Sequence, residues 1–278
     1  MRIQTRYFRR WDYDRGEYGE GKGWELSMKL IQGDCLEKMK DIEGGSVDAI
    51  ITDLPYGTTA CKWDVVIPFE PMWAQVKRVL KKNGVFVTTA SQPFTSALVM
   101  SNPKMFKYEW IWEKNRGSNF ATTKYQPMKE HENVLVFCEG ATVYNPIYEN
   151  RAEGGKARAL HVINPSNTGR RETLNGMEAK DSRNINPDQR VPRSIQKFNT
   201  EVGQHPTQKP VALLEYLIKT YTNEGETVLD FTMGSGTTGV ACKHLNRNFI
   251  GIELEEKYFN IAKERIENID PLFKVVGL

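Results

Sequence analysis

Little in this chain points to a membrane, secreted or disulfide-stabilised protein. Its 278 residues include only four cysteines, and none forms a CxxC pair or a cluster with histidine. Zinc sites and disulfide frameworks are therefore poor interpretations, and buried free thiols are expected. No apolar run approaches the roughly 18 residues of a membrane span, and no apolar segment follows the basic N-terminal residues as it would in a secretory signal. We therefore expect a cytoplasmic protein.

The chain also has little excess charge. Its 38 basic and 35 acidic residues give a net charge of +3, which permits a nucleic-acid partner but does not argue for one, because such binding requires clustered basic residues. Hydrophobic residues make up 39% and charged residues 26% of the chain, as in ordinary globular proteins. The length suits one large α/β domain with an insertion, or two smaller domains.

A glycine-rich turn near the C-terminus carries the first functional signal. An apolar run leads to Asp230 and Phe231, and the turn Gly234-Ser235-Gly236 then precedes Thr237. This order predicts a strand, a loop and a helix start, where backbone N–H groups and the helix dipole face a polar or anionic ligand. Such a loop usually comes early in a nucleotide-binding domain. Its late position indicates either a second domain or a circularly rearranged fold.

Apolar runs alternate with amphipathic segments from Leu30 onward, which predicts a mainly parallel sheet with helices on both faces. The expected strands are residues 28–34, 47–53, 84–90, 108–112, 134–138, 227–230 and 249–253. The expected helices are residues 71–82, 93–100, 210–221, 236–245 and 255–269.

Two regions lack this alternation of apolar runs and amphipathic segments. Residues 1–27 show no sustained period, so an irregular N-terminal arm is expected, and an upstream extension is favoured over a DNA- or partner-contacting arm. Residues 140–200 combine many basic side chains with weak apolar periodicity. A structureless loop of that length is unusual inside a compact domain, so the segment is either a small inserted recognition region or a partly mobile one. Its basic residues taken alone also fit a merely solvated surface.

The second functional signal is Asp53-Leu54-Pro55-Tyr56, at the carboxyl end of the expected strand 47–53. Ligands bind at that end of the strands in open parallel sheets. The Asp53 carboxylate and the Leu54 carbonyl would accept hydrogen bonds from an exocyclic base amine and orient its lone pair. Pro55 stiffens the turn, and Tyr56 offers a ring for stacking on a base that has left the duplex. An ordinary turn is the alternative.

Two further acids follow expected strands. Glu253 lies about twenty residues after the glycine turn, where an acid accepts hydrogen bonds from ribose hydroxyls in nucleotide sites. Asp34 is positioned to accept a hydrogen bond from an adenine amino group. For Glu253, a cap of the following helix is the alternative interpretation.

Together these segments resemble the S-adenosylmethionine-dependent DNA amino-methyltransferases. Asp53-Leu54-Pro55-Tyr56 is similar to their catalytic tetrapeptide, and the segment from Asp230 to Thr237 is similar to their cofactor loop. His205-Pro206-Thr207-Gln208-Lys209 resembles the segment before that loop, and the order matches the permuted beta class. Asp34-Cys35 falls where the family has its adenine-binding acid. Trp112-Glu113-Lys114 and His131-Glu132-Asn133 also resemble family segments.

The resemblance implies one circularly permuted Rossmann-like domain with a seven-stranded mixed sheet, formed by residues 28–139 and 201–278. Residues 140–200 would be its target-recognition region. It also implies methyl transfer from S-adenosylmethionine to a flipped-out base, with no metal because the sulfonium is already activated. The residues implied to bind the cofactor are Asp34, Cys35, Asp53, His205, Thr207, Lys209, Asp230, Phe231, Gly234, Ser235, Gly236, Thr237 and Glu253.

The tetrapeptide departs from the family pattern at one position. Leu54 replaces the first of two prolines, which relaxes the backbone and adds an N–H donor but leaves the proposed carbonyl acceptor in place. Asp53 resembles the adenine-N6 members, whereas cytosine-N4 members more often carry serine. Cytosine-C5 chemistry needs a cysteine nucleophile, typically after proline, and the chain has no Pro-Cys pair.

A DNA adenine-N6 methyltransferase is therefore the leading interpretation. Three alternatives stay open: cytosine-N4 methylation, a non-catalytic methyltransferase-like DNA-binding subunit, and methylation of RNA or protein. The resemblance implies double-stranded DNA as partner and a bacterial or phage-infected host cell. The recognition sequence, a homodimer and a cognate restriction endonuclease are left undecided by the sequence.

Overall fold

The computed structural model describes residues 9–12, 17–20, 26–59, 61, 64–156, 186–201, 203 and 207–269. The chain forms two compact units. One contains residues 1–144 and 195–278, and the other contains residues 145–194. His205, one of the expected cofactor residues, lies outside the described residues.

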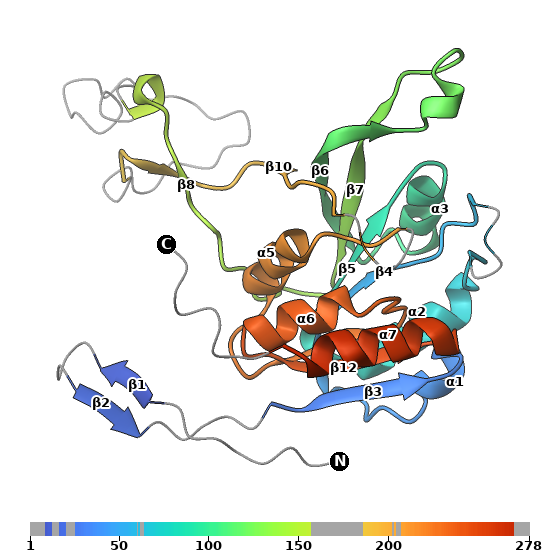
Figure 1. Ribbon diagram of the computed structural model, residues 1–278, viewed down its shortest axis with the longest axis horizontal. Helices are drawn as coiled ribbons and strands as arrows, with labels where there is room; N and C mark the ends of the chain where they lie inside the picture. Colours follow the sequence, from blue (N-terminus) through green and yellow to red (C-terminus); the bar gives the residue numbers. More distant parts are fainter. Residues whose placement is uncertain are drawn as a thin grey trace. The chain divides into compact units, whose positions relative to one another are not determined.

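An eight-stranded mixed sheet forms the centre of the large unit (Figure 1). Its strands run in the order β10-β6-β7-β5-β4-β11-β12-β3. β7 pairs antiparallel with both β5 and β6, and the other neighbours pair in parallel. The strand bounds are β3 Met28–Gln32, β4 Val47–Asp53, β5 Leu80–Ala90, β6 Phe106–Ser118, β7 Lys129–Phe137, β10 Ile195–Lys197, β11 Thr227–Asp230 and β12 Asn248–Glu253.

The two faces of the sheet build two hydrophobic cores. Successive side chains of a strand point to opposite faces, and β4 places Ile51 in one core and Ile50 in the other. Because both faces are covered, such strands are apolar throughout rather than alternating. This explains why residues 47–53 could be predicted as a buried strand.

Helices cover both faces. Helices α5, α6 and α7 pack on the face that contains Ile51, and helices α1, α2 and α3 on the face that contains Ile50. The helix bounds are α1 Cys35–Met39, α2 Phe69–Val79, α3 Phe94–Ser101, α5 Val211–Tyr221, α6 Thr237–His244 and α7 Glu256–Glu267. A 3-10 turn, η1, spans Phe120–Thr122. The expected helices therefore form at the expected places, with ends at most three residues from those expected. Residues 80–82, expected in the helix 71–82, instead begin β5.

Strands from the two ends of the chain lie side by side. β11 pairs with β4, and β12 pairs with β3, so two C-terminal strands are inserted between two N-terminal ones. The late glycine turn therefore belongs to the same sheet as Asp53, and no second nucleotide-binding domain is needed to explain its position.

The expected number of strands was wrong. The sheet has eight strands rather than seven because β10 pairs in parallel with β6 at one edge. β10 has three residues, and Ile195 is 53% exposed. A segment this short shows no period by which it could be predicted.

Other regions add short pairings. β1, Arg9–Asp12, pairs with β2, Glu17–Glu20, so the arm expected to be irregular contains a two-stranded ribbon. In the small unit, β8, Glu149–Asn150, pairs with β9, Gln189–Arg190. This unit lies within the expected region 140–200 but ends before β10, which belongs to the main sheet. No helix in the described part of the chain has the length and hydrophobicity of a membrane span.

Candidate functional site

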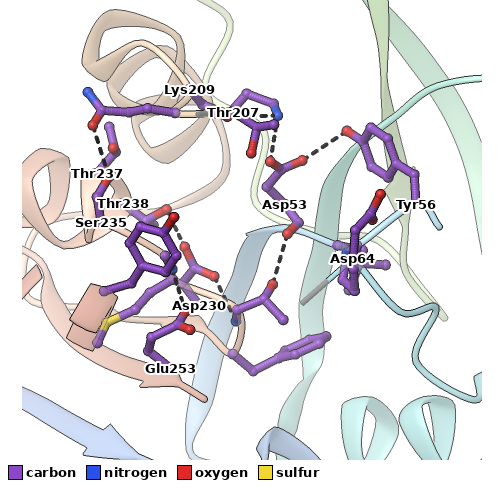
Figure 2. Close-up of a pocket in the computed structure, with 18 of the residues that line it drawn as sticks. Asp53, Tyr56, Asp64, Thr207, Lys209, Asp230, Ser235, Thr237, Thr238 and Glu253 are labelled. Carbon is purple, nitrogen blue, oxygen red and sulfur yellow. Dashed lines mark hydrogen bonds and ion pairs between the residues drawn. The ribbon is translucent and has the colours of Figure 1, made fainter. Parts of the chain in front are cut away.

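A pocket of about 700 Å³ lies at the carboxyl ends of the central strands. β4, β11 and β12 run parallel and end at Asp53, Asp230 and Glu253, so their terminal carboxylates converge on this pocket (Figure 2). The volume is in the range of small-molecule sites. The edge of the sheet at which the sequence predicts a ligand site therefore contains a pocket lined by acidic side chains.

The Asp53 carboxylate is held by three side chains. Lys209 Nζ lies 2.5 Å from Oδ2, and the Tyr56 hydroxyl donates to Oδ1 over 2.8 Å. The Thr89 hydroxyl also donates to Oδ1. Since a carboxylate oxygen accepts about two hydrogen bonds, Oδ1 is filled, whereas Oδ2 keeps one lone pair for a ligand.

Lys209 is part of a buried chain of charges. Its ammonium lies 3.6 Å from Glu132 Oε2, and Lys114 pairs with the other oxygen of Glu132. The Lys209 side chain is 8% exposed. Burial opposes the charge on Lys209, but Asp53 and Glu132 raise its pKa. Burial likewise opposes ionisation of Glu132, while Lys209 and Lys114 lower its pKa. These opposite charges keep one another ionised.

Asp230 is satisfied from within the protein. Its carboxylate accepts hydrogen bonds of 2.6 Å from the hydroxyls of Thr52 and Thr238 and one of 3.2 Å from the Thr232 N–H. Burial raises the pKa of Asp230 to about 6, although these donors oppose the shift. Thr232 also donates to the Asp53 carbonyl over 3.0 Å. Hydrogen bonds therefore join the carboxyl ends of β4 and β11.

Glu253 ties the glycine turn to the end of β12. Its two oxygens accept hydrogen bonds from the N–H groups of Gly234 (2.8 Å) and Glu255 (2.9 Å). Burial raises the pKa of Glu253, against these hydrogen bonds. Glu253 lines the pocket, where its carboxylate can accept a further hydrogen bond from a ligand.

The glycine turn is packed against α7. Gly236 has φ +78°, and a Cβ there would lie 2.8 Å from that of Ala262, so glycine is required by both conformation and space. Arg265 donates to the Ser235 carbonyl over 2.6 Å and contacts the Thr237 hydroxyl at 3.3 Å. Arg265 therefore fixes the turn that precedes α6.

The Tyr56 ring is braced as well as hydrogen-bonded. It stacks on Phe94 with 5.2 Å between the ring centroids, and Lys209 Nζ lies 5.8 Å from its centroid. The chain after Tyr56 is organised by Asp64, which accepts hydrogen bonds of 2.7–2.9 Å from the N–H groups of residues 57–59. Burial opposes ionisation of Asp64, and these hydrogen bonds lower its pKa.

Most of the sequence-predicted residues line this one pocket. Asp34 is exposed at its rim, where its side chain caps α1 by accepting from the Glu37 N–H. Gly236 is beside the pocket in the turn but is not among its lining residues. The expected residues that do line it are Asp34, Cys35, Asp53, Leu54, Pro55, Tyr56, Thr207, Lys209, Asp230, Phe231, Gly234, Ser235, Thr237 and Glu253.

Four residues with clear positional roles were not singled out from the sequence: Lys114, Glu132, Asp64 and Arg265. Lys114 and Glu132 lie in two of the segments that resemble the family, which was the only signal available. Asp64 and Arg265 act through backbone groups that the fold brings near, so no local pattern marks them.

The sequence and the structure were compared with known proteins. A family model described as DNA methylase matches residues 47–264. The chain is 30% identical over 259 residues to the DNA adenine methyltransferase YhdJ of Escherichia coli strain K12, covering 86% of this chain and 82% of that protein. It is 29% identical over 260 residues to the type II methyltransferase M.HpaI of Haemophilus parainfluenzae, covering 87% and 75%.

A solved structure shares the fold. The crystal structure of the M1.HpyAVI–SAM complex matches with a TM-score of 0.57 and 28% sequence identity, and the match covers 86% of this chain and 99% of that one.

Proposed function

The chain belongs to the DNA methylase family, and on that premise we propose that it transfers a methyl group from S-adenosylmethionine to N6 of adenine at specific sites in double-stranded DNA. The observation that carries this proposal is the Asp53 carboxylate, oriented by Lys209 and Tyr56 inside the pocket. The relative named as a DNA adenine methyltransferase, at 30% identity, supports adenine as the target base.

The pocket has the groups that S-adenosylmethionine needs. Glu253 offers carboxylate lone pairs to ribose hydroxyls, and Asp34 offers an acceptor to the adenine amino group. The N-terminus of α6, beginning at Thr237, presents backbone N–H groups and a positive dipole end to the methionine carboxylate. When bound, the cofactor supplies a methyl group attached to a sulfonium sulfur, which is a good leaving group.

Asp53 performs the orienting step. A flipped adenine donates one N6–H to Asp53 Oδ2, the oxygen that keeps a lone pair, and the other to the Leu54 carbonyl. These two acceptors pull the amine toward a tetrahedral shape and aim its lone pair at the methyl carbon. As the C–N bond forms, the bond between that methyl carbon and the sulfonium sulfur would break and leave a neutral thioether. N6 then loses one of these protons, which passes through the Asp53 carboxylate to water. Tyr56 and Thr89 hold Oδ1 and so fix the plane of the carboxylate.

Labelled methyl transfer tests this function. The full-length protein is incubated with labelled S-adenosylmethionine and DNA from a methylation-deficient host, and the DNA is then digested to nucleosides. N6-methyladenine supports the proposal, and N4-methylcytosine assigns the protein to the cytosine-N4 branch instead. Label in neither nucleoside, with retained DNA binding, identifies a non-catalytic subunit. Asp53→Ala is the matched inactive variant, and modification-sensitive sequencing of the product gives the recognition site.

The remaining roles follow from DNA as substrate. Residues 140–200 form the target-recognition region, and the protein acts in the cytoplasm of a bacterial or phage-infected cell. A homodimer and a cognate restriction endonuclease are part of this proposal. Light scattering of the purified protein tests the first. The second is tested by whether expression protects host DNA from an endonuclease that cuts the identified site.

A further inference from the structure

The ribbon formed by β6 and β7 ends in an exposed aromatic tip. Figure 1 shows the two strands continuing past the rest of the sheet into a bent turn that contains a short helical segment. In that turn Phe120 is 80% exposed and Tyr125 is 83% exposed. Both aromatic side chains are therefore available to a partner.

The tip is ordered by its own hydrogen bonds. The carbonyl of Asn119 accepts from the N–H of Thr122 over 2.9 Å, and the carbonyl of Thr122 accepts from the N–H of Tyr125 over 2.9 Å. Gln126 Nε2 also donates to the Thr122 hydroxyl over 2.8 Å. The two aromatic side chains therefore project from a fixed turn, which lowers the entropy that is lost when they dock.

The ribbon also forms one wall of the pocket. Trp112, Lys114 and Ser118 of β6 and Glu132 of β7 line it. Phe120 follows Ser118 by two residues, so the Cα atoms of these two residues are no more than about 7 Å apart. The exposed Phe120 therefore lies two residues along the chain from a residue that lines the pocket.

The charge of the tip matches a polyanion. From Lys114 to Lys129 the chain carries four basic residues and no acidic residue. Arg116 and Lys124 are exposed, and Lys124 Nζ lies 5.8 Å from the centroid of the Tyr125 ring. Cations beside aromatic rings suit a partner that offers phosphates and stackable bases together.

We propose that this tip inserts between base pairs beside the target adenine, where Phe120 and Tyr125 stack in the space left by the flipped base while Arg116 and Lys124 contact the flanking phosphates. This inference rests on the proposed function, because it takes double-stranded DNA as the partner. An inserted apolar side chain offsets the stacking lost when a base leaves the duplex. The tip therefore acts on the opening of the base pair and not on the methyl transfer itself.

The test compares two duplexes that contain the recognition site identified by sequencing. In one the target adenine pairs with thymine, and in the other it faces an abasic site, so no base pair has to be broken for the adenine to leave the duplex. The variant is Phe120→Ala with Tyr125→Ala in the full-length protein. Met100→Ala is the matched control because Met100 is 72% exposed at the end of α3. Fluorescence of 2-aminopurine at the target position reports extrusion directly.

We expect the double variant to lose roughly tenfold or more in kcat/KM and extrusion on the paired duplex, and less than threefold on the abasic duplex. The double variant Phe120→Trp with Tyr125→Phe should restore kcat/KM and base extrusion on the paired duplex. The affinity for S-adenosylmethionine should not change in either double variant. Equal losses on both duplexes, or no loss on either, would overturn the inference. So would a change of oligomeric state in the double variant with unaltered extrusion, since the tip would then bind a second copy. A wild-type protein that methylates no DNA refutes the proposed function itself.

Discussion

Lys209→Met provides the sharpest test of the active-site architecture. The sequence resemblance implies that Lys209 binds the cofactor, whereas the structure places its ammonium 2.5 Å from Asp53 and 3.6 Å from Glu132. Methionine keeps the unbranched side chain out to Cε and removes the ammonium group with its charge and hydrogen bonds. The variant therefore separates cofactor binding from the positioning of Asp53.

The size of the effect follows from burial. Removing one partner of a fully buried ion pair destabilises a protein by about 3–5 kcal/mol. Here Asp53 is 27% exposed and Glu132 keeps Lys114 as a partner, so we expect a loss of about 2–3 kcal/mol in the free energy of unfolding. Because Asp53 loses the cation that orients it, kcat should fall by about 100-fold. The Kd for S-adenosylmethionine should change by less than threefold.

The pH dependence of stability has a definite sign. The pKa of Glu132 is lowered in the folded protein, with Lys209 one of the causes that act against burial. The stabilisation is therefore complete above the ordinary glutamate value of 4.5 and is lost as the pH falls through the lowered pKa. The difference between the wild type and Lys209→Met should be constant from neutral pH to about 5 and shrink in more acidic solution.

Denaturant unfolding at several pH values, calorimetric cofactor binding and steady-state kinetics measure these quantities. Lys81→Met is the control, because Lys81 is 48% exposed in its pair with Asp48 and its loss should cost less than about 1 kcal/mol. Cofactor affinity reduced tenfold or more, with kcat unchanged at saturating S-adenosylmethionine, would refute the assignment of Lys209 to Asp53.

Three further predictions concern single contacts. Asp230→Asn removes a carboxylate whose pKa burial raises to about 6. The folded wild type therefore holds an extra proton between about pH 4 and 6 and loses stability as the pH rises through that window, by about 3 kcal/mol at most. The stability of the variant relative to the wild type should therefore rise between about pH 4 and pH 6 and level off at higher pH, and a difference that does not depend on pH would contradict this. Arg265→Met frees the turn at Ser235, so the Kd for S-adenosylmethionine should rise about tenfold. Lys263→Met, an exposed position on the same helix, should leave that Kd unchanged, and equal effects of the two would exclude a specific role. Tyr56→Phe keeps the ring but removes the 2.8 Å hydrogen bond to Asp53. It should lower kcat roughly tenfold with little change in stability, and an unchanged kcat would show that the hydroxyl is dispensable.

Local patterns predicted most elements of the large unit. β4 and β11 are short apolar runs that end in acids, and α5 and α7 carry apolar residues at helical spacing, so their types follow from periodicity. The extensions of β6 and β7 beyond residues 112 and 134 were not predicted, because the ribbon there is partly solvated and carries polar side chains. β10 and α1, with three and five residues, are too short to show a period.

The site was predicted in part because strand ends can be located from the sequence. Asp53, Asp230 and Glu253 each end a parallel strand, and parallel strands bring their carboxyl ends to one edge. Lys209 was recognised as belonging to the pocket, but its partners were not, since 156 residues separate it from Asp53. The cofactor contacts proposed for the lining residues remain predictions.

The sequence by itself determined which residues are predicted to carry the chemistry, because an acid after an apolar run and glycines before a helix are recognisable within a few neighbouring positions. It also placed the glycine turn late in the chain, without deciding between a second domain and a rearranged one. Only the tertiary structure decided that β11 and β12 lie between β4 and β3, and that Lys209, Glu132 and Lys114 form one buried chain of charges around Asp53. Such contacts depend on strand order and side-chain burial, which are properties of the whole sheet and leave no trace in any local stretch of sequence.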